Sequence, residues 1–426
     1  MRDYYAEAFT FLNCGDYVTH LDGNDIRGHD VQASTIERWS TRPALGPLYK
    51  AHLCASKRIA VLTEATVVGI DLDPAGLRTD CVKVYLHGRM REVRARSYVL
   101  AGGGLENGRL LLATQRNWPR KFGGPEGALG RFYQGHLTGY IAIVEFQNRQ
   151  VEKSLSFQKD RGGTHFRRRL QISAGAQQEN ALLNSAFWLD GLSIADATHG
   201  SGAFSALYLP LAFSGVYRIL SKGLAPKAKF DGQHYRGHLQ NMRSDPALFQ
   251  DIVRCTGNLI DSRLRGRRTV PNPKGRYVLR YHAEQTPIPE SRVRLSESQS
   301  NSLLPALKVD YLVNDKDVAS VLRSHQFLDR WLSENAIGKL HYLHDANRRD
   351  DAVFRQAFDG YHQIGLARMS ASPRDGVVNT DCRLHDVTNL YVAGSAVFPT
   401  GGQANPTLPA VALALRLGTH LATVRG

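Results

Sequence analysis

The alternation of apolar and polar positions along the chain predicts a mixture of strands and helices. Apolar runs and period-two patterns predict strands at residues 58–62, 65–72, 81–86, 91–95, 97–101, 139–146, 165–173, 181–189, 276–284 and 389–394. Apolar residues at helical spacing predict helices at 2–12, 43–56, 105–113, 203–217, 315–334 and 407–424. His87-Gly88 between two of the strands predicts a hairpin turn. The pattern therefore indicates an α/β fold.

Length and composition narrow the class of protein. The chain has 426 residues, which at about 150 residues per domain indicates two or three domains. Hydrophobic residues make up 42% and charged residues 22%, a balance that excludes a disordered chain. The apolar stretch 203–217 is too short and too interrupted to cross a membrane, and the first residues lack the pattern of a signal peptide.

The five cysteines lie far apart and form no CxxC pair. This spacing argues against a disulfide framework and against a thiolate zinc site. We therefore expect no metal centre, and we expect a reducing, cytoplasmic location.

The formal net charge of +15 raises the question of nucleic-acid binding. The densest basic segment, RLRGRRTVPNPKGR at 263–276, contains glycine and proline residues that predict a loop. Aromatic residues are not interleaved with its arginines, as single-strand binding requires, and no helix-turn-helix, zinc-finger or RRM signature is present. We expect no nucleic-acid partner and a small-molecule substrate instead.

The predicted strand at 97–101 runs directly into Gly102-Gly103-Gly104, and a predicted helix follows. Glycines allow a close approach to a ligand, and a helix N-terminus offers N–H groups to an anion. The GxGxxG spacing is absent, because Asn107 stands where the third glycine would be. The segment is consistent both with a phosphate cradle and with a plain structural turn.

Two residues near the C-terminus are candidates for chemistry. His362 lies in the polar segment YHQIGLARM, where a histidine can act as a general base near neutral pH. A structural or surface histidine fits the same context. Asn405 precedes Pro406 at the start of a predicted helix, which is typical of an N-cap. At that position it would also lie at the positive end of the helix dipole.

The last part of the chain resembles the C-terminal signature of the glucose–methanol–choline (GMC) family of flavin oxidoreductases. The resemblance covers residues 389–421, NLYVAGSAVFPTGGQANPTLPAVALALRLGTHL. The preceding HQIGLARM and GVVNTDCRLHDV resemble the block before that signature, and SYVLAGGGLENGRLLLAT resembles an upstream family block. EQTPIPESRVRLS, at 284–296, resembles a substrate-domain segment of sugar- and polyol-oxidising members.

The resemblance implies a catalytic pair and a cofactor. His362 would accept the alcohol proton while hydride passes to flavin N5, and Asn405 would orient the same hydroxyl. The cofactor would be FAD, and the residues along it would be Val67, Ala101, Gly102, Gly394, Ser395, Ala404, Asn405, Pro406 and Thr407. The implied function is oxidation of a CH–OH group of a sugar, polyol or other alcohol.

The family resemblance also implies a domain plan. A split FAD-binding domain would consist of residues 1–129 and 346–426, with an inserted α+β substrate domain at 130–345. The GxGxxG βαβ unit with which the family begins is not found here, so the resemblance implies an N-terminally truncated member. A non-catalytic fragment or subunit that binds a ligand or partner is the alternative function, and a separate N-terminal FAD-binding chain or an electron acceptor is a possible partner. Gln403 departs from the small residue common in the family.

Overall fold

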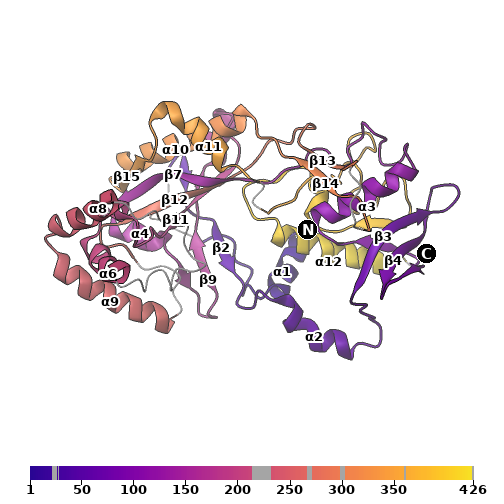
Figure 1. Ribbon diagram of the computed structural model, residues 1–426, viewed down its shortest axis with the longest axis horizontal. Coiled ribbons are helices and arrows are strands. Elements are labelled where there is room, and N and C mark those ends of the chain that lie inside the picture. The colour runs from indigo at the N-terminus through magenta and orange to yellow at the C-terminus, as the bar shows by residue number, and fades with distance from the viewer. Residues whose placement is uncertain are drawn as a thin grey trace.

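The computed structural model describes residues 1–21, 26, 28–213, 232–265, 271–297, 303–358 and 361–424. Figure 1 shows two lobes side by side. One lobe, called the sheet lobe, is built on a six-stranded sheet, and the other, called the glycine-turn lobe, carries a smaller set of strands with both chain termini beside it.

The sheet lobe is organised by strands in the order β1-β10-β11-β12-β7-β15, all antiparallel. Their bounds are β1 Val31–Gln32, β7 Leu137–Phe146, β10 Leu170–Ile172, β11 Ser185–Asp190, β12 Arg276–Ala283 and β15 Gly338–Tyr342. One face is covered by α10 (Asp315–Glu334) and α11 (Arg349–Gln356) (Figure 1). Burial of apolar side chains between the sheet and α10 forms the largest core of the molecule.

The helix α10 is well specified by its own sequence. Asn314 caps its N-terminus by accepting from the Asp317 N–H, and the Asp317 side chain accepts from the Asn314 N–H in return. Its inner face packs Val321, Leu328 and Leu332 against the sheet. The capping residues and the spacing of the apolar residues therefore both favour a helix at this position.

His325 lies on the inner face of α10 and gives the fold a predicted pH dependence. It is fully buried, packs edge-on against Phe187 and Tyr281, and has its pKa lowered to about 4 by burial. Because the unfolded chain binds a proton below about 6.5 and the folded chain does not until about 4, folding stability is lost as the pH falls through this window. We expect the loss from this group to be ~3 kcal/mol.

Urea unfolding at several pH values tests this expectation with a His325→Leu variant. The variant should lose less stability than the wild-type chain between pH 7 and pH 4, since leucine has no proton to bind. Equal losses in the two chains would contradict the assignment. His87→Leu, at an exposed turn, is the matched control.

Helices and short strands complete the sheet lobe. The three-stranded sheet β2-β9-β8 lies beside the large sheet. The remaining elements are β2 Ile36–Trp39, β8 Gln158–Lys159, β9 His165–Arg168, α4 Arg149–Leu155, α5 Ala174–Glu179, η1 Ala197–His199, α6 Gly202–Phe213, α8 Gly232–Arg243, α9 Leu248–Arg265 and η2 Ala346–Arg348. β1 and β2 come from the first 129 residues but pair with strands of the middle region, and the predicted domain boundaries stay a prediction.

The glycine-turn lobe contains three small sheets with the orders β3-β4-β5, β16-β6 and β13-β14. Helix α1 lies beside α12, and α3 packs against β3 (Figure 1). The bounds are α1 Arg2–Phe11, α2 Leu45–Ala55, β3 Ala65–Leu72, β4 Thr79–Leu86, β5 Arg89–Val93, β6 Tyr98–Leu100, α3 Gly104–Asn117, β13 Arg292–Leu295, β14 Leu307–Asp310, β16 Leu390–Val392, η3 Ser395–Val397 and α12 Thr407–Thr423. None of the helices described here is long and apolar enough to cross a membrane.

Most predicted elements are confirmed, and three are wrong or altered. The predicted strand at 58–62 is not formed, and Val61 and Leu62 are exposed. The predicted strand 165–173 is divided into β9 and β10, which belong to different sheets. Part of the predicted basic loop is helical, since α9 extends to Arg265, and residues 266–270 lie outside the described chain. Residues 214–217 of the predicted helix 203–217 also lie outside it.

Candidate active site

His362 is fixed beside His136 by a short antiparallel pairing of two segments. Gln134 and Ile364 exchange backbone hydrogen bonds of 3.0 Å, and His136 forms a bridge with Phe358. This pairing brings the Nδ1 atoms of His362 and His136 to 2.9 Å. One of the two nitrogens donates to the other, so the two rings share one proton position.

His282 joins this pair from β12. In the register of the large sheet it lies opposite Thr138 on β7, two residues beyond His136. Alternation along the strand turns its side chain away from α10, and its ring stacks on that of His136 with centroids 4.1 Å apart. Its Nδ1 contacts the Gln403 carbonyl oxygen at 2.8 Å. A carbonyl oxygen can accept but not donate, so Nδ1 carries the proton and Nε2 has the free lone pair.

Burial keeps two of the three histidines neutral. It lowers the pKa of His136 to about 2, with the neighbouring His282 and His362 adding to the effect. Burial likewise lowers the pKa of His282 to about 4, against the hydrogen bond to Gln403 that raises it. Neither ring therefore carries a charge near neutral pH. A proton taken up by His362 would therefore lie beside two uncharged rings.

Charged and aromatic side chains border the histidines on the same face of the sheet. Arg169 pairs with Glu37 at 2.9 Å, and Arg167 pairs with the same carboxylate at 2.7 Å. Burial works to raise the pKa of Glu37, but the two arginines outweigh it and the net shift is downward. The Arg169 guanidinium lies 4.7 Å from the Trp188 ring centroid. Arg167, Arg169 and Trp188 therefore place hydrogen-bond donors and an aromatic surface beside the histidines.

The two glycine turns predicted to meet the cofactor lie side by side. β6 and β16 are parallel, with Leu390 opposite Tyr98, so both strands end at the same edge. Gly103 and Gly394 follow them with φ values of +89° and +103°. A Cβ built at either glycine meets nothing within 4 Å. Space beside both turns is open, and Ala101 and Gly102 are exposed.

Asn107, which stands in place of the third glycine, connects these two turns. Its side chain accepts from the Gly102 N–H at 2.9 Å and donates to the Ala393 carbonyl at 3.0 Å. The residue is fully buried. The departure from GxGxxG is therefore explained by a structural bond across the two strands.

Replacing Asn107 with alanine should lower the free energy of unfolding by about 1–3 kcal/mol, because it removes a buried side chain whose two hydrogen bonds hold the Gly102 N–H and the Ala393 carbonyl. Urea unfolding measures the change. Asn117→Ala, at the exposed end of the same helix, is the matched control and should stay near wild type. Unfolding midpoints that agree between the two variants would contradict the connecting role of Asn107.

Gln363 ties His362 to both glycine turns. Its side-chain oxygen accepts from the Leu105 N–H at the start of α3, at 3.2 Å. Its carbonyl accepts from the Ser395 hydroxyl at 2.8 Å. The candidate base is thus held at a fixed place relative to the edge where the two strands end.

The loop before α12 approaches the histidines at Gly402 and Gln403. Gln403 contacts His282 through its carbonyl and Arg169 through its side chain. Asn405 and Ala404 are exposed. The expectation that Asn405 caps the helix is wrong: the N-cap residue is Pro406, and no side chain caps α12, whose first residue is Thr407. Pro406 has a φ of −74°, which the proline ring fixes and which suits the start of a helix.

Val67 lies on β3 opposite Val84, half-buried against the core of the glycine-turn lobe. Val67 therefore lies in the same lobe as the other predicted cofactor residues. His136 and His282 were not predicted from the sequence. Period-two alternation along 276–283 could have found His282, because it places that residue on the face opposite Tyr277, Leu279 and Tyr281.

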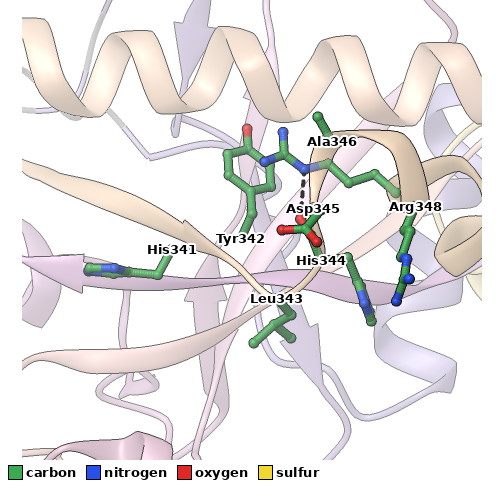
Figure 2. Close-up of a pocket in the computed structure, with 8 residues that line it drawn as sticks. His341, Tyr342, Leu343, His344, Asp345, Ala346 and Arg348 are labelled. Atoms are coloured by element: carbon green, nitrogen blue, oxygen red, sulfur yellow. Dashed lines mark hydrogen bonds between the residues drawn. The ribbon is translucent and has the colours of Figure 1, made fainter.

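A surface hollow lies elsewhere, at the end of β15. Figure 2 shows His341, Tyr342, His344 and Arg348 around it. Arg349 lies over the Tyr342 ring at 3.7 Å and donates to the His344 carbonyl. None of the predicted site residues lines this hollow.

Residues 287–414 match the family model described as GMC oxidoreductase. This range includes His362, both blocks around it and part of α12, so the resemblance seen in the sequence is confirmed over the C-terminal part of the chain.

Two curated proteins align with about a third of the chain. The 2-methyl-1,2-propanediol dehydrogenase of Mycolicibacterium austroafricanum is 30% identical over 140 residues, which is 32% of this chain and 24% of that protein. The C-glycoside 3-oxidase of Microbacterium trichothecenolyticum is 32% identical over 134 residues, 31% of this chain and 24% of that protein. The aligned part spans about a quarter of the length of these relatives.

Solved structures share the fold over nearly the whole chain. The pyridoxine 4-oxidase from Mesorbium loti has a TM-score of 0.53 and 17% identity, covering 100% of this chain and 70% of that one. An FAD-dependent oxidoreductase from Chaetomium thermophilum has a TM-score of 0.50 and 16% identity, covering 99% and 71%. The likeness confirms a mixed α/β fold of the kind found in these oxidoreductases.

Proposed function

We propose that this chain carries the active site of an FAD-dependent oxidoreductase that acts on a CH–OH group of a sugar, polyol or other alcohol. The proposal rests on two hydrogen bonds of Gln363, the residue next to His362. Gln363 accepts from the Leu105 N–H and from the Ser395 hydroxyl, and these bonds hold His362 beside the two open glycine turns. The GMC match over residues 287–414 supports the family. Relatives named as a diol dehydrogenase and a glycoside oxidase support the substrate class.

The residues fit FAD at the paired glycine turns. Gly103 and Gly394 leave space where a Cβ would lie, and the N-terminus of α3 begins at the same edge. The predicted cofactor residues Ala101, Gly102 and Ser395 line this edge, while the start of α12 supplies a second helix N-terminus with no acidic residue in its first turn. FAD, when bound, supplies the acceptor for the hydride that leaves the carbinol carbon.

His362 has the role of proton acceptor in this proposal. A carbinol hydride leaves readily as the neighbouring oxygen loses its proton, so a base has to lie at that oxygen. His362 is half-buried, and the neutral rings of His136 and His282 beside it do not oppose its taking up a proton. Asn405, two residues beyond Gln403 in the loop, is proposed to orient the hydroxyl. The product is the corresponding carbonyl compound.

Absorption spectroscopy tests the proposal directly. The purified chain is mixed with FAD, passed through a gel-filtration column and examined for flavin absorption that co-elutes with protein. A loaded chain is then screened against sugars, polyols and simple alcohols with an artificial electron-accepting dye, and the carbonyl product is identified by mass spectrometry. A chain that retains no flavin, or that retains it and oxidises no CH–OH compound, would contradict the proposal.

A further inference from the structure

The rings of His136, His282 and His362 converge on one point. One ring nitrogen of each lies within 4.8 Å of the others. The Nδ1 atoms of His136 and His362 are 2.9 Å apart, whereas two nitrogen ligands of one tetrahedral zinc ion lie about 3.3 Å apart, given Zn–N bonds of 2.0–2.1 Å. A shift of a few tenths of an ångström would therefore let a metal ion replace the proton that these two rings share.

The ring nitrogens of the histidines, and the hydrogen bond that orients His282, are arranged as in a metal-binding site. The Gln403 carbonyl accepts from His282 Nδ1, which leaves Nε2 of that ring as the ligand atom. A backbone carbonyl that holds the second ring nitrogen is the usual support of a metal-bound histidine. His136 is fully buried, and its Nδ1 atom, 2.9 Å from Nδ1 of His362, is the nitrogen that would bind the ion.

The charges nearby affect the binding of a cation. Metal ions bind the neutral form of imidazole through one ring lone pair. Arg169 is the cation next to the histidines, and the Glu37 carboxylate pairs both with it at 2.9 Å and with Arg167 at 2.7 Å. Two guanidinium groups and one carboxylate leave one net positive charge beside the cluster, which the three nitrogen ligands have to outweigh.

We propose that His136, His282 and His362 bind one divalent transition-metal ion of the zinc class. Three imidazole nitrogens suit zinc, copper and nickel ions better than calcium or magnesium. This inference does not rest on the proposed oxidation and departs from the sequence expectation of no metal site. An ion in this position would occupy a lone pair of His362, so metal binding and proton acceptance exclude each other there.

Calorimetry on the tag-free, EDTA-treated and FAD-free chain tests the site with zinc ions alone. We expect one ion per chain, and we expect His282→Ala and His362→Ala each to weaken binding roughly tenfold or more. His87→Ala, at an exposed hairpin turn outside the cluster, is the matched control and should bind as the wild type does. Absence of binding, or equal affinity in all four proteins, would overturn the proposal.

X-ray absorption at the zinc edge of the wild-type chain provides a measurement that needs no variant. Three imidazole nitrogens at about 2.0 Å are expected. Sulfur ligands, or a shell of oxygen atoms alone, would overturn the assignment. Because neither experiment contains flavin or substrate, failure of the metal site and failure of the proposed oxidation can be told apart.

Discussion

His362→Ala is expected to lower the rate of alcohol or sugar oxidation by the FAD-loaded chain by roughly 10²- to 10⁴-fold, the usual contribution of a positioned general base. The reason is geometric: the ring beside His136 lies where the glycine-turn edge and the sheet face meet, and alanine leaves no proton acceptor there. Steady-state assays with the electron-accepting dye measure the change in kcat.

Two further measurements separate a lost base from a damaged site. Flavin binding by His362→Ala should match the wild type, since the glycine turns are held by Asn107 and Gln363. Added imidazole should restore part of the activity, because it can accept the proton in the vacated space. His344→Ala, in the surface hollow of Figure 2, is the matched control and should keep full activity. A His362→Ala chain with normal turnover would contradict the assigned role.

Local sequence signals predicted the elements that depend on neighbours in the chain. The β3-β4-β5 meander follows from alternation and from His87-Gly88, whose φ values of +47° and +77° confirm the turn. The helix α10 agrees with its predicted bounds because a capping box and one apolar face coincide there. Pairing between distant strands could not be predicted from local sequence. Residues 58–62 have strand propensity, but no described strand pairs with them, and Val61 and Leu62 remain exposed.

The candidate site shows the same division between local and long-range information. His362 was predicted because a recognisable block surrounds it, and the paired glycine turns because strands run into glycines. His136 and His282 reach the site through the pairing of β7 with β12 and of residue 134 with residue 364. These registers join positions more than a hundred residues apart. The role of Asn405 was inferred from the family resemblance and stays a prediction.

Gly365→Ala is expected to destabilise the chain by roughly 3 kcal/mol or more, because backbone strain and a steric clash add at this position. Gly365 has a φ of +92°, and a Cβ there would lie 2.2 Å from the Phe132 carbonyl oxygen. That oxygen belongs to the segment that pairs with residue 364. Relief of the clash has to separate the two segments and pull His362 from His136.

Gly163→Ala is the matched control for this prediction. Gly163 has a similar φ of +83°, but a Cβ built there meets nothing within 4 Å, so the strain of the backbone acts without a clash and should cost about 1 kcal/mol. Urea unfolding compares the two variants, and histidine NMR resonances report whether the ring pair has separated. If Gly365→Ala costs no more than Gly163→Ala, the close crossing of the 132 and 365 backbones does not fix the position of His362, and the geometric basis of its role as the base is removed.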